Sequence, residues 1–434
     1  MNSSLEMALA EAESRFIAAN PGSAARHETA SQAMPGGNTR TVLHFDPFPL
    51  AWRKGEGAVL EDVDGHRYTD FLGEYSAGLY GHSNPVILEA VRAALADGIV
   101  LGGPNGYEAG LAGALQERFP SLELLRFCNS GTEANMFAIQ TARAATRRSK
   151  VMVFEGGYHG GVFYFRQGGI PLNLPIDWVI APYNDTEKTI ELIKQHGKDL
   201  AAVLVEPMLG SGCLPADPTF LLALRESCTA HGIVLIFDEV MTSRLSTGGL
   251  QAALRITPDM TTLGKYLGGG MTFGAFGGRR DLMQRFDPAR ADAWPHAGTF
   301  NNNVLTMSAG LTGLTKVYTA EAVATLNAKG DRLRNGINDL ARRHEAPVLA
   351  TGHGSFIGLH FSTRPITRPQ DIDPAGEPKR KALHKLMHLD FIAGGIYMAR
   401  RGYMALMLPL SDADIGKFLA VMEEFLQSRR QILS

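Results

Sequence analysis

Short apolar segments alternate with amphipathic segments through the middle of the chain, from about residue 72 to residue 325. The apolar segments lie at 124–128, 150–154, 201–206, 232–240, 260–264 and 272–278. Their length and uninterrupted apolar character are typical of buried strands. Helical patterns lie between several of them, as at 132–146 and 219–231. Apolar strands separated by helices predict an α/β fold with a mostly parallel sheet that is covered on both faces.

The two ends of the chain carry a different pattern. The expected elements there are a capped amphipathic helix at 3–20, a hairpin at 57–71, a long helix at 325–344, strands near 353–362, a Pro- and charge-rich loop at 363–380 and a terminal helix at 412–431. The hairpin turns at Asp64-Gly65, a strong turn signal. Because one hairpin is not stable alone, we expect residues 1–71 to join residues 326–434 in a small α+β domain beside a large domain at 72–325.

Composition narrows the class of protein. The 434 residues carry 42 Lys and Arg against 44 Asp and Glu, a net charge of -2, which argues against a nucleic-acid partner. The three cysteines have no CxxC spacing, so we expect neither a disulfide framework nor a structural zinc. The sequence has no signal-peptide pattern and no apolar stretch of about 18 residues, so we expect a soluble cytoplasmic protein without a membrane partner. The 48 glycines indicate many turns or close backbone approaches.

Polar residues follow the apolar strands, where parallel sheets place their active sites. Ser130-Gly131-Thr132 comes directly after 124–128 and opens a helix. Backbone N–H groups, the helix dipole and two hydroxyls at this point would form a cradle for a phosphate. The alternative is an ordinary helix N-cap, which uses the same residue types.

Two further strands end in candidate residues. Tyr158-His159 lies between glycine pairs after 150–154, so an aromatic ring there could stack on a flat ligand. A glycine-rich turn with a half-buried tyrosine is the alternative. Asp238 ends the most hydrophobic strand, where a carboxylate needs a partner such as a protonated pyridine nitrogen. A simple N-cap is the alternative for Asp238.

The fourth candidate is Lys265, which follows 260–264 and precedes Gly268-Gly269-Gly270. An amine in a confined place can have a lowered pKa and form a Schiff base, whereas most lysines are solvated surface charges. A phosphate cradle, a stacking ring, a pyridine partner and a Schiff-base lysine together are the parts of a pyridoxal 5'-phosphate site. No metal is expected: His384 and His388 have i,i+4 spacing, but no third ligand is evident and histidines on a helix face are usually solvated.

These motifs resemble the signatures of the class III aminotransferases, which have the fold of type I pyridoxal-phosphate enzymes. The resemblance covers about residues 30 to 425. The segments that carry it are Ser130-Gly131-Thr132, Tyr158-His159-Gly160, Asp238-Glu239-Val240-Met241 and Gly264-Lys265. It implies a large domain with a mostly parallel, seven-stranded sheet between helices, a small α+β domain and pyridoxal 5'-phosphate as the cofactor.

The resemblance also implies roles for single residues. Lys265 would bind the cofactor as a Schiff base and shuttle protons, and Asp238 would pair with the pyridine nitrogen. Tyr158 would stack on one face of the cofactor ring, and Val240 would pack on the other face. His159 would belong to the same cofactor site. Glu206 would be a polar support. Thr299 resembles a threonine that reaches the phosphate of the neighbouring subunit, which implies an obligate homodimer with active sites at its interface.

Two branches of the family compete. Gly36-Gly37-Asn38 and 274–278 are similar to glutamate-1-semialdehyde 2,1-aminomutases, but Ser243-Arg244 and Phe300-Asn301-Asn302-Asn303 depart from that pattern. Residues 40–43, 74–78, 298–303 and 401–403 resemble aromatic β-amino acid aminotransferases of the (S)-β-phenylalanine type. An ω-amino acid or amine transaminase and a pyridoxal-phosphate-binding protein without catalysis are further alternatives.

In the β-amino acid branch, the arginine matching Arg40 binds the carboxylate of the β-amino acid. The arginine matching Arg401 binds the α-carboxylate of the keto-acid acceptor, 2-oxoglutarate or pyruvate. Arginine suits both roles because its planar guanidinium clamps a carboxylate with two hydrogen bonds. Arg40 could instead be a surface turn residue, and Arg400 could replace Arg401. Tyr75 and Met241 are candidates for the side-chain pocket, with plain core as the alternative.

Overall fold

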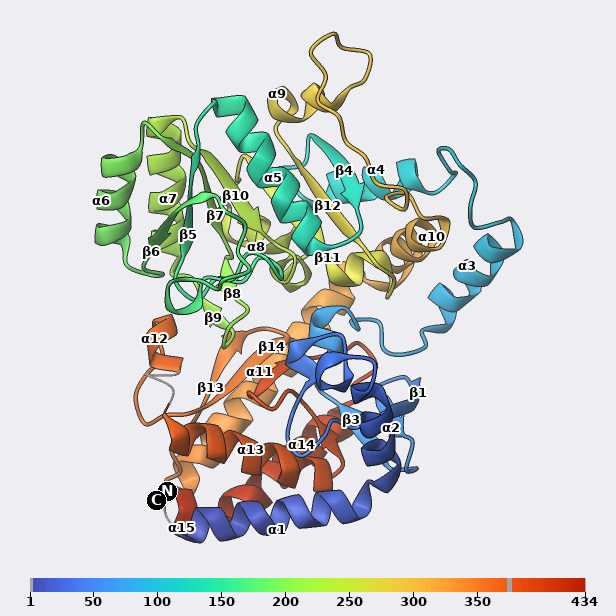
Figure 1. Ribbon diagram of the computed structural model, residues 1–434, viewed down its shortest axis with the longest axis vertical. Coiled ribbons are helices and arrows are strands. Elements are labelled where there is room, and N and C mark those ends of the chain that lie inside the picture. Colours follow the sequence, from blue (N-terminus) through green and yellow to red (C-terminus); the bar gives the residue numbers. More distant parts are fainter. Residues whose placement is uncertain (1–2, 373–376, 434) are drawn as a thin grey trace.

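A seven-stranded sheet forms the centre of the upper part of the molecule in Figure 1. The computed structural model describes residues 3–372 and 377–433. The strand order is β4-β12-β11-β10-β7-β5-β6. The strands are β4 (Leu124–Cys128), β5 (Lys150–Phe154), β6 (Asp177–Ala181), β7 (Leu200–Val205), β10 (Val234–Asp238), β11 (Met260–Gly264) and β12 (Gly274–Gly278). Only β12 runs antiparallel to its neighbours, which confirms the predicted mostly parallel sheet.

Helices cover both faces of this sheet, because successive residues of a strand point to opposite faces. Val151 and Val153 pack in one apolar cluster with residues of α5 (Gly131–Thr146). Met152 and Phe154 pack in another with residues of α7 (Pro218–His231) and α6 (Thr186–His196). The helices expected at 132–146 and 219–231 are therefore confirmed as α5 and α7.

Strand β6 was not predicted from the sequence. It lies at the edge of the sheet and pairs only with β5. Its five residues, DWVIA, begin with an exposed aspartate and are only partly buried. An edge strand needs no continuous apolar run, so the hydrophobic pattern alone is too weak to identify it.

Smaller sheets form the other part of the molecule. One has the order β1-β2-β3-β15 and another the order β13-β14-β16, while β8 and β9 form a two-stranded ribbon. Their strands are β1 (Trp52–Glu56), β2 (Val59–Asp62), β3 (Arg67–Asp70), β15 (Ile396–Tyr397), β13 (Val348–His353), β14 (Phe356–Phe361), β16 (Tyr403–Ala405), β8 (Met208–Leu209) and β9 (Leu214–Pro215). The hairpin expected at 57–71 is confirmed as β2 and β3, which pair antiparallel on either side of Asp64-Gly65.

The two ends of the chain lie together in the lower part of Figure 1. Strand β15 pairs in parallel with β3, so residues separated by more than 300 positions share one sheet. Helix α1 (Ser3–Ala19) packs on α13 (Pro378–Ala393), and Arg15 bonds to Asp390 at 2.8 Å. This arrangement favours a small domain built from both termini, while the boundaries at residues 72 and 325 stay a prediction.

The remaining α-helices complete the fold. They are α2 (Pro21–Ser31), α3 (Pro85–Ala96), α4 (Glu108–Arg118), α8 (Gly249–Leu254), α9 (Arg280–Met283), α10 (Val304–Thr312), α11 (Ala320–Arg343), α12 (Pro369–Ile372), α14 (Asp412–Ser428) and α15 (Arg430–Leu433). The long helix and the terminal helix expected near the C-terminus correspond to α11 and α14, and the strands expected near 353–362 form the hairpin of β13 and β14. The expected loop at 363–380 contains α12 and the first turn of α13, and its residues 373–376 lie outside the described part.

Helix α13 corrects one expectation. His388 is only 2% exposed, so the prediction of a solvated histidine is wrong for this residue. The Phe45 ring packs against the His388 ring at a centroid distance of 4.6 Å, and burial lowers the pKa of His388 to about 3. The residues described hold no group of three or more His, Cys, Asp or Glu that could bind a metal. Among the described helices, none is long and apolar enough to cross a membrane.

Candidate active site

The ends of three central strands come together through close glycine contacts. Gly131 follows β4, Val240 follows β10 and Gly264 ends β11. A Cβ atom on Gly131 would lie 2.9 Å from both methyl groups of Val240, and one on Gly264 would lie 3.1 Å from the nearer methyl. The two glycines therefore let the Val240 side chain lie between the strand ends, which brings three of the predicted motifs into one site.

The turn after β4 forms a helix cap and leaves backbone N–H groups that can bind an anion. The Ser130 Oγ atom accepts a hydrogen bond from the Glu133 N–H at 3.2 Å, as expected of an N-cap. The first N–H groups of α5, on Gly131 and Thr132, have no acceptor within the helix, so they can bind an anion. A Cβ atom on Gly160 would lie 2.3 Å from the Thr132 hydroxyl oxygen. The predicted segment 158–160 therefore closes one side of this cradle.

Asp238 is held by a buried polar network. Its Oδ2 atom accepts a hydrogen bond from Asn135 Nδ2 at 2.8 Å and lies 2.7 Å from His159 Nδ1. Its Oδ1 atom accepts one from the Val240 N–H at 3.0 Å. The Asn135 Oδ1 atom in turn accepts a hydrogen bond from the Thr262 hydroxyl at 2.7 Å. Asn135 and Thr262 were missed by the sequence reasoning because they lie inside a helix and a strand, without a turn signal beside them.

Lys265 lies directly after β11 in a left-handed conformation, with φ of 57°. Non-glycine residues adopt this conformation at some cost, and such residues concentrate at functional sites. The pKa of the Lys265 amine is lowered to about 8, mainly by burial; the charges of Asp238 and Glu206 oppose this effect, and those of Arg401 and Arg244 add to it. The lowered pKa gives the Lys265 side chain a larger share of the neutral, nucleophilic amine near neutral pH than a solvated lysine has.

Glu206 and Tyr158 meet in the same region. Glu206 follows β7 and accepts hydrogen bonds from the backbone N–H groups of Tyr158 and Gly210, each at 2.9 Å. Burial raises the pKa of the Glu206 carboxyl. The Tyr158 side chain is 52% exposed and packs edge-on against the Tyr164 ring at 5.5 Å. Its ring is thus supported from one side and free to meet a flat ligand.

Arg40 and Arg401 share one aromatic partner. The guanidinium carbons of Arg40 and Arg401 lie 5.5 Å and 5.6 Å from the centre of the Tyr75 ring. Arg40 also forms an ion pair with Glu74. Arg400, the alternative to Arg401, instead bonds to Asp46 at 3.4 Å. The structure therefore groups Arg40 with Arg401 and directs Arg400 to a different partner.

The turn that carries Tyr75 has an unusual backbone. Glu74, Tyr75 and Ser76 have φ values of 47°, 52° and 80°, three consecutive non-glycine residues in the left-handed region. The Tyr75 hydroxyl donates to the Val42 carbonyl at 3.0 Å, and the Tyr75 ring stacks on Tyr403 at 5.5 Å. Tertiary contacts thus hold a conformation that the local sequence disfavours.

Met241 and Thr299 have contrasting environments. Met241 is buried, and its sulfur lies 3.5 Å from the Tyr403 hydroxyl, which joins it to the aromatic group around Tyr75. Thr299 is exposed, beside Phe300, whose side chain is 62% exposed. Asn301 in the same segment accepts a hydrogen bond from Asn129 at 3.0 Å, so this segment lies at the start of α5. The role of Thr299 toward a neighbouring subunit stays a prediction.

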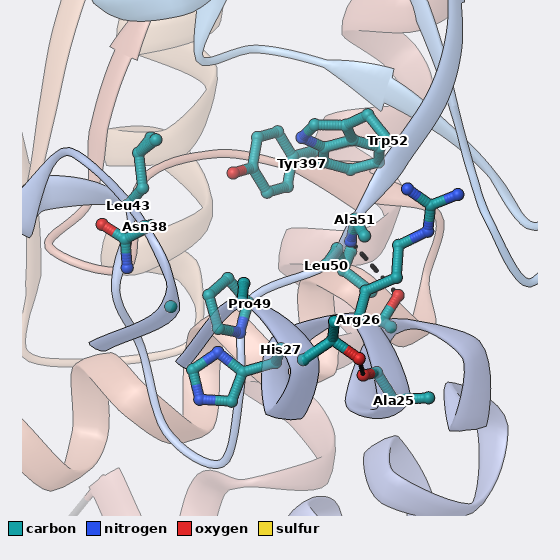
Figure 2. A pocket seen from close by; sticks show the side chains of 14 residues that line it. Ala25, Arg26, His27, Asn38, Leu43, Pro49, Leu50, Ala51, Trp52 and Tyr397 are labelled. Carbon is teal, nitrogen blue, oxygen red and sulfur yellow. Dashed lines mark hydrogen bonds between the residues drawn. The ribbon is translucent and has the colours of Figure 1, made fainter. Parts of the chain in front are cut away.

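A separate cavity of about 660 Å³ lies near the loop that carries Arg40 (Figure 2). Its walls include His27, Asn38, Trp52 and Tyr397, and the Ala51 N–H beside it bonds to the Ser23 hydroxyl at 3.2 Å. None of the strand-end residues of the candidate site lines it. The Arg40 side chain itself contacts Glu74 and the Tyr75 ring.

The close contact at Gly131 leads to a stability prediction. Gly131→Ala is expected to lower the free energy of unfolding by about 1–3 kcal/mol, because the new methyl group overlaps the Val240 side chain. Gly113→Ala in α4 is the matched control, since its Cβ would meet nothing within 4 Å and alanine favours helix. Urea unfolding of both variants tests this, and equal stabilities would contradict the packing described.

Comparisons with known proteins show the family and the fold. The family model described as "Aminotransferase class-III" matches residues 43–165 and 170–426. A β-phenylalanine transaminase of Variovorax paradoxus is 48% identical over 433 residues, which cover 100% of this chain and 99% of that protein. A solved structure of a β-phenylalanine aminotransferase from the same species has a TM-score of 0.96 at 48% identity and 99% coverage of both chains. A glutamate-1-semialdehyde aminomutase structure from Pseudomonas aeruginosa has a TM-score of 0.89 at 23% identity, with 98% of both chains covered, so this likeness shows only the fold.

The site also has the chemical groups that pyridoxal 5'-phosphate requires. It combines the start of α5, whose first N–H groups can bind an anion, with a buried carboxylate on Asp238 and an amine on Lys265 whose pKa is lowered to about 8. Among the described residues, none accepts a hydrogen bond from the Lys265 amine, which leaves that amine available to a ligand. The chain therefore belongs to the class III aminotransferases, enzymes that use pyridoxal 5'-phosphate.

Proposed function

We propose that this aminotransferase moves the amino group of an aromatic β-amino acid, such as β-phenylalanine, to an α-keto acid, 2-oxoglutarate or pyruvate. The observation that carries this proposal is the pair of guanidiniums, Arg40 and Arg401, on one tyrosine ring. In a β-amino acid the carboxylate lies one carbon further from the amine-bearing carbon than the carboxylate of an α-keto acid lies from its carbonyl carbon. A single site that accepts both substrates must therefore bind carboxylates at two positions, and two arginines meet this need.

The identity of the relatives supports the same substrate class, since a transaminase named for β-phenylalanine shares 48% of its residues with this chain. In this assignment Arg40 binds the carboxylate of the β-amino acid. Arg401, rather than Arg400, binds the α-carboxylate of the acceptor, because Arg401 shares the Tyr75 ring with Arg40 whereas Arg400 is directed to Asp46. Tyr75 lies between the two positions and lines the side-chain pocket.

Roles for the remaining residues follow from the site. The N–H groups and hydroxyls of Ser130, Gly131 and Thr132 would hold the phosphate. Asp238, oriented by His159 and Asn135, would bind the ring nitrogen. The remaining cofactor contacts would come from Tyr158 and Val240 on the two ring faces, with Glu206 and Met241 as supports.

When bound, pyridoxal 5'-phosphate supplies an electron sink for the carbon that carries the amino group. Lys265 would hold the cofactor, and its free amine would take a proton from that carbon. Its amine suits this role because burial favours the neutral form. The donor product leaves before the acceptor enters, since both use the same lysine and the same pocket, which makes the reaction ping-pong.

We also propose that the protein acts as a cytoplasmic homodimer. Thr299 would reach the phosphate bound by the partner subunit, an assignment supported by the exposure of residues 297–300. Size measurement in solution at micromolar concentration tests the dimer. A monomer that retains full activity would contradict the role given to Thr299.

A single assay separates the candidate functions. The protein is mixed with 3-amino-3-phenylpropanoate and 2-oxoglutarate, and glutamate is measured. Glutamate formation supports the proposal, whereas an aminomutase would need no keto acid. If 1-phenylethylamine, which lacks a carboxylate, is used equally well, the protein is an amine transaminase. A protein that only binds the cofactor would show no change in its visible absorbance on addition of donor.

The role of Arg40 makes a quantitative prediction. Arg40→Ala is expected to raise KM for the β-amino acid about 10- to 100-fold, because a charged pair of hydrogen bonds to its carboxylate is lost. KM for 1-phenylethylamine, which has no carboxylate, is expected to stay nearly unchanged. Arg400→Ala is the control, because its guanidinium bonds to Asp46 on the surface. An equal effect of Arg40→Ala on both donors would refute the assignment.

A further inference from the structure

The Asn135 side chain joins three segments of the candidate site. It extends from α5, and its Nδ2 atom donates to the Asp238 carboxylate at 2.8 Å and to the His159 carbonyl at 3.0 Å. Its Oδ1 atom accepts a hydrogen bond from the Thr262 hydroxyl of β11 at 2.7 Å. Asn135 is 1% exposed and Thr262 is 0% exposed, so bulk water has no access to these atoms. The N–H groups and the oxygen of the amide are therefore bonded inside the protein.

The chemistry of these partners permits one orientation of the amide. The ionised Asp238 carboxylate and the His159 carbonyl only accept hydrogen bonds, so they must face the Nδ2 atom. The Thr262 hydroxyl has one hydrogen to donate, and it faces the Oδ1 atom. Rotation of the amide by half a turn would place its oxygen against two other acceptors. A buried network that is complete in one arrangement only fixes the positions of its members.

Thr262 lies beside Asp238 in the sheet as well as through the amide. Strands β10 and β11 are parallel neighbours with Asp238 opposite Thr262 in register. Among the described residues, Asn135 is the one hydrogen-bond partner of the Thr262 hydroxyl. Without this hydroxyl the Oδ1 atom of Asn135 would be buried without a donor, which is costly. The amide would then regain a donor only by moving away from the carboxylate that it holds.

We propose that Thr262 is a positioning residue for Asp238: its hydroxyl fixes the Asn135 amide, and the amide in turn fixes the carboxylate that faces the ring nitrogen of the bound cofactor. This inference rests on the proposed role of Asp238. The other carboxylate oxygen accepts a hydrogen bond from the Val240 N–H at 3.0 Å, so both oxygens are held. A carboxylate held in this way need not reorganise when it binds a protonated ring, which strengthens the interaction.

Binding of pyridoxamine 5'-phosphate to the full chain stripped of cofactor tests this without turnover, because this ligand forms no Schiff base with Lys265. Thr262→Val has nearly the same shape but no hydroxyl, and it is expected to raise Kd about 5- to 20-fold through the loss of one buried hydrogen bond. Thr262→Ser, which keeps the hydroxyl, is expected to bind close to the wild type. An analogue with carbon in place of the ring nitrogen is expected to have the same Kd for Thr262→Val as for the wild type.

Thr261→Val is the matched control. Thr261 is the neighbouring residue of β11, equally buried, and its hydroxyl bonds on the opposite face of the sheet to Ser121 at 2.7 Å and to Gln251 at 3.0 Å. This variant is expected to lower the free energy of unfolding in urea and to leave Kd for both ligands unchanged. If Kd for pyridoxamine 5'-phosphate rose equally in Thr261→Val and Thr262→Val, the proposal would be overturned.

Two further results would also overturn it. One is an unchanged Kd for pyridoxamine 5'-phosphate in folded Thr262→Val. The other is an equal rise for this ligand and for its carbon analogue, because a general loosening of the site does not depend on the ring nitrogen. If Thr262→Val does not fold, Thr262→Ala takes its place with the same expectations.

The wild type distinguishes failure of this inference from failure of the role given to Asp238. If Asp238 binds the ring nitrogen, the wild type binds pyridoxamine 5'-phosphate more tightly than the carbon analogue. Equal binding of the two ligands by the wild type would refute the role of Asp238. A preference that Thr262→Val retains in full would overturn only the role of Thr262.

Discussion

Replacing Lys265 with alanine is expected to lower kcat for transamination by at least about 10³-fold, because one atom supplies both the covalent attachment and the proton transfer. No second lysine follows a strand of the central sheet at this edge in the described residues, so no neighbouring amine can replace it. Steady-state rates with 3-amino-3-phenylpropanoate and 2-oxoglutarate measure the effect.

The matched control for this variant is Lys316→Ala, which removes an exposed lysine. It is expected to keep wild-type rates. Retention of cofactor by the Lys265 variant, measured after gel filtration, is expected to fall but not to vanish, because the phosphate cradle and Asp238 remain. Turnover by Lys265→Ala within tenfold of the wild type would refute the mechanism as a whole.

Replacing Asp238 with asparagine is expected to lower kcat about 10²- to 10³-fold. The two side chains have nearly the same shape, so the contacts with Asn135 and Val240 can persist in altered form. The negative charge, however, is lost, and only that charge stabilises a proton on the ring nitrogen during the reaction. The variant thus separates the electrostatic contribution of the carboxylate from its packing.

Asp259→Asn provides a control of closely matched burial. Asp259 is 6% exposed against 4% for Asp238, but it bonds to Arg225 and Arg279 at 2.9 Å and 3.0 Å. Its loss is expected to reduce the free energy of unfolding without reducing kcat, because these partners have no place in the reaction. If Asp259→Asn reduced kcat as much as Asp238→Asn, the effect at Asp238 would have to be attributed to stability.

The central sheet and its strand-end residues could be predicted from the sequence because two signals occur together. One is an uninterrupted apolar run, and the other is a polar or charged residue directly after it. An apolar run such as 234–238 must be buried, and a charged residue at its end must lie at the mouth of the sheet. Asp238 and Lys265 meet both conditions, and the structure places them, together with the polar Ser130, at or just after strand ends.

The residues that sequence reasoning missed are polar or charged side chains that are buried, where the usual pattern of hydrophobic and polar positions places apolar ones. Asn135 occupies an interior helix position and orients Asp238 only through the fold. Arg244 is a fully buried charge, which composition rules place on the surface. His388 was expected to be solvated and is buried. In each case a contact between distant parts of the chain decides the environment, and no local signal records such a contact.

The left-handed turn at Glu74, Tyr75 and Ser76 sets the stability of the fold against the recognition of the substrate. Glycine at any of these positions is expected to release backbone strain and to raise the melting temperature. The same change would loosen the one ring that both guanidiniums share. Selection for a more heat-resistant enzyme and selection for a more discriminating one would therefore act in opposite directions on these three residues, and homologues adapted to high temperature would reveal which pressure prevailed.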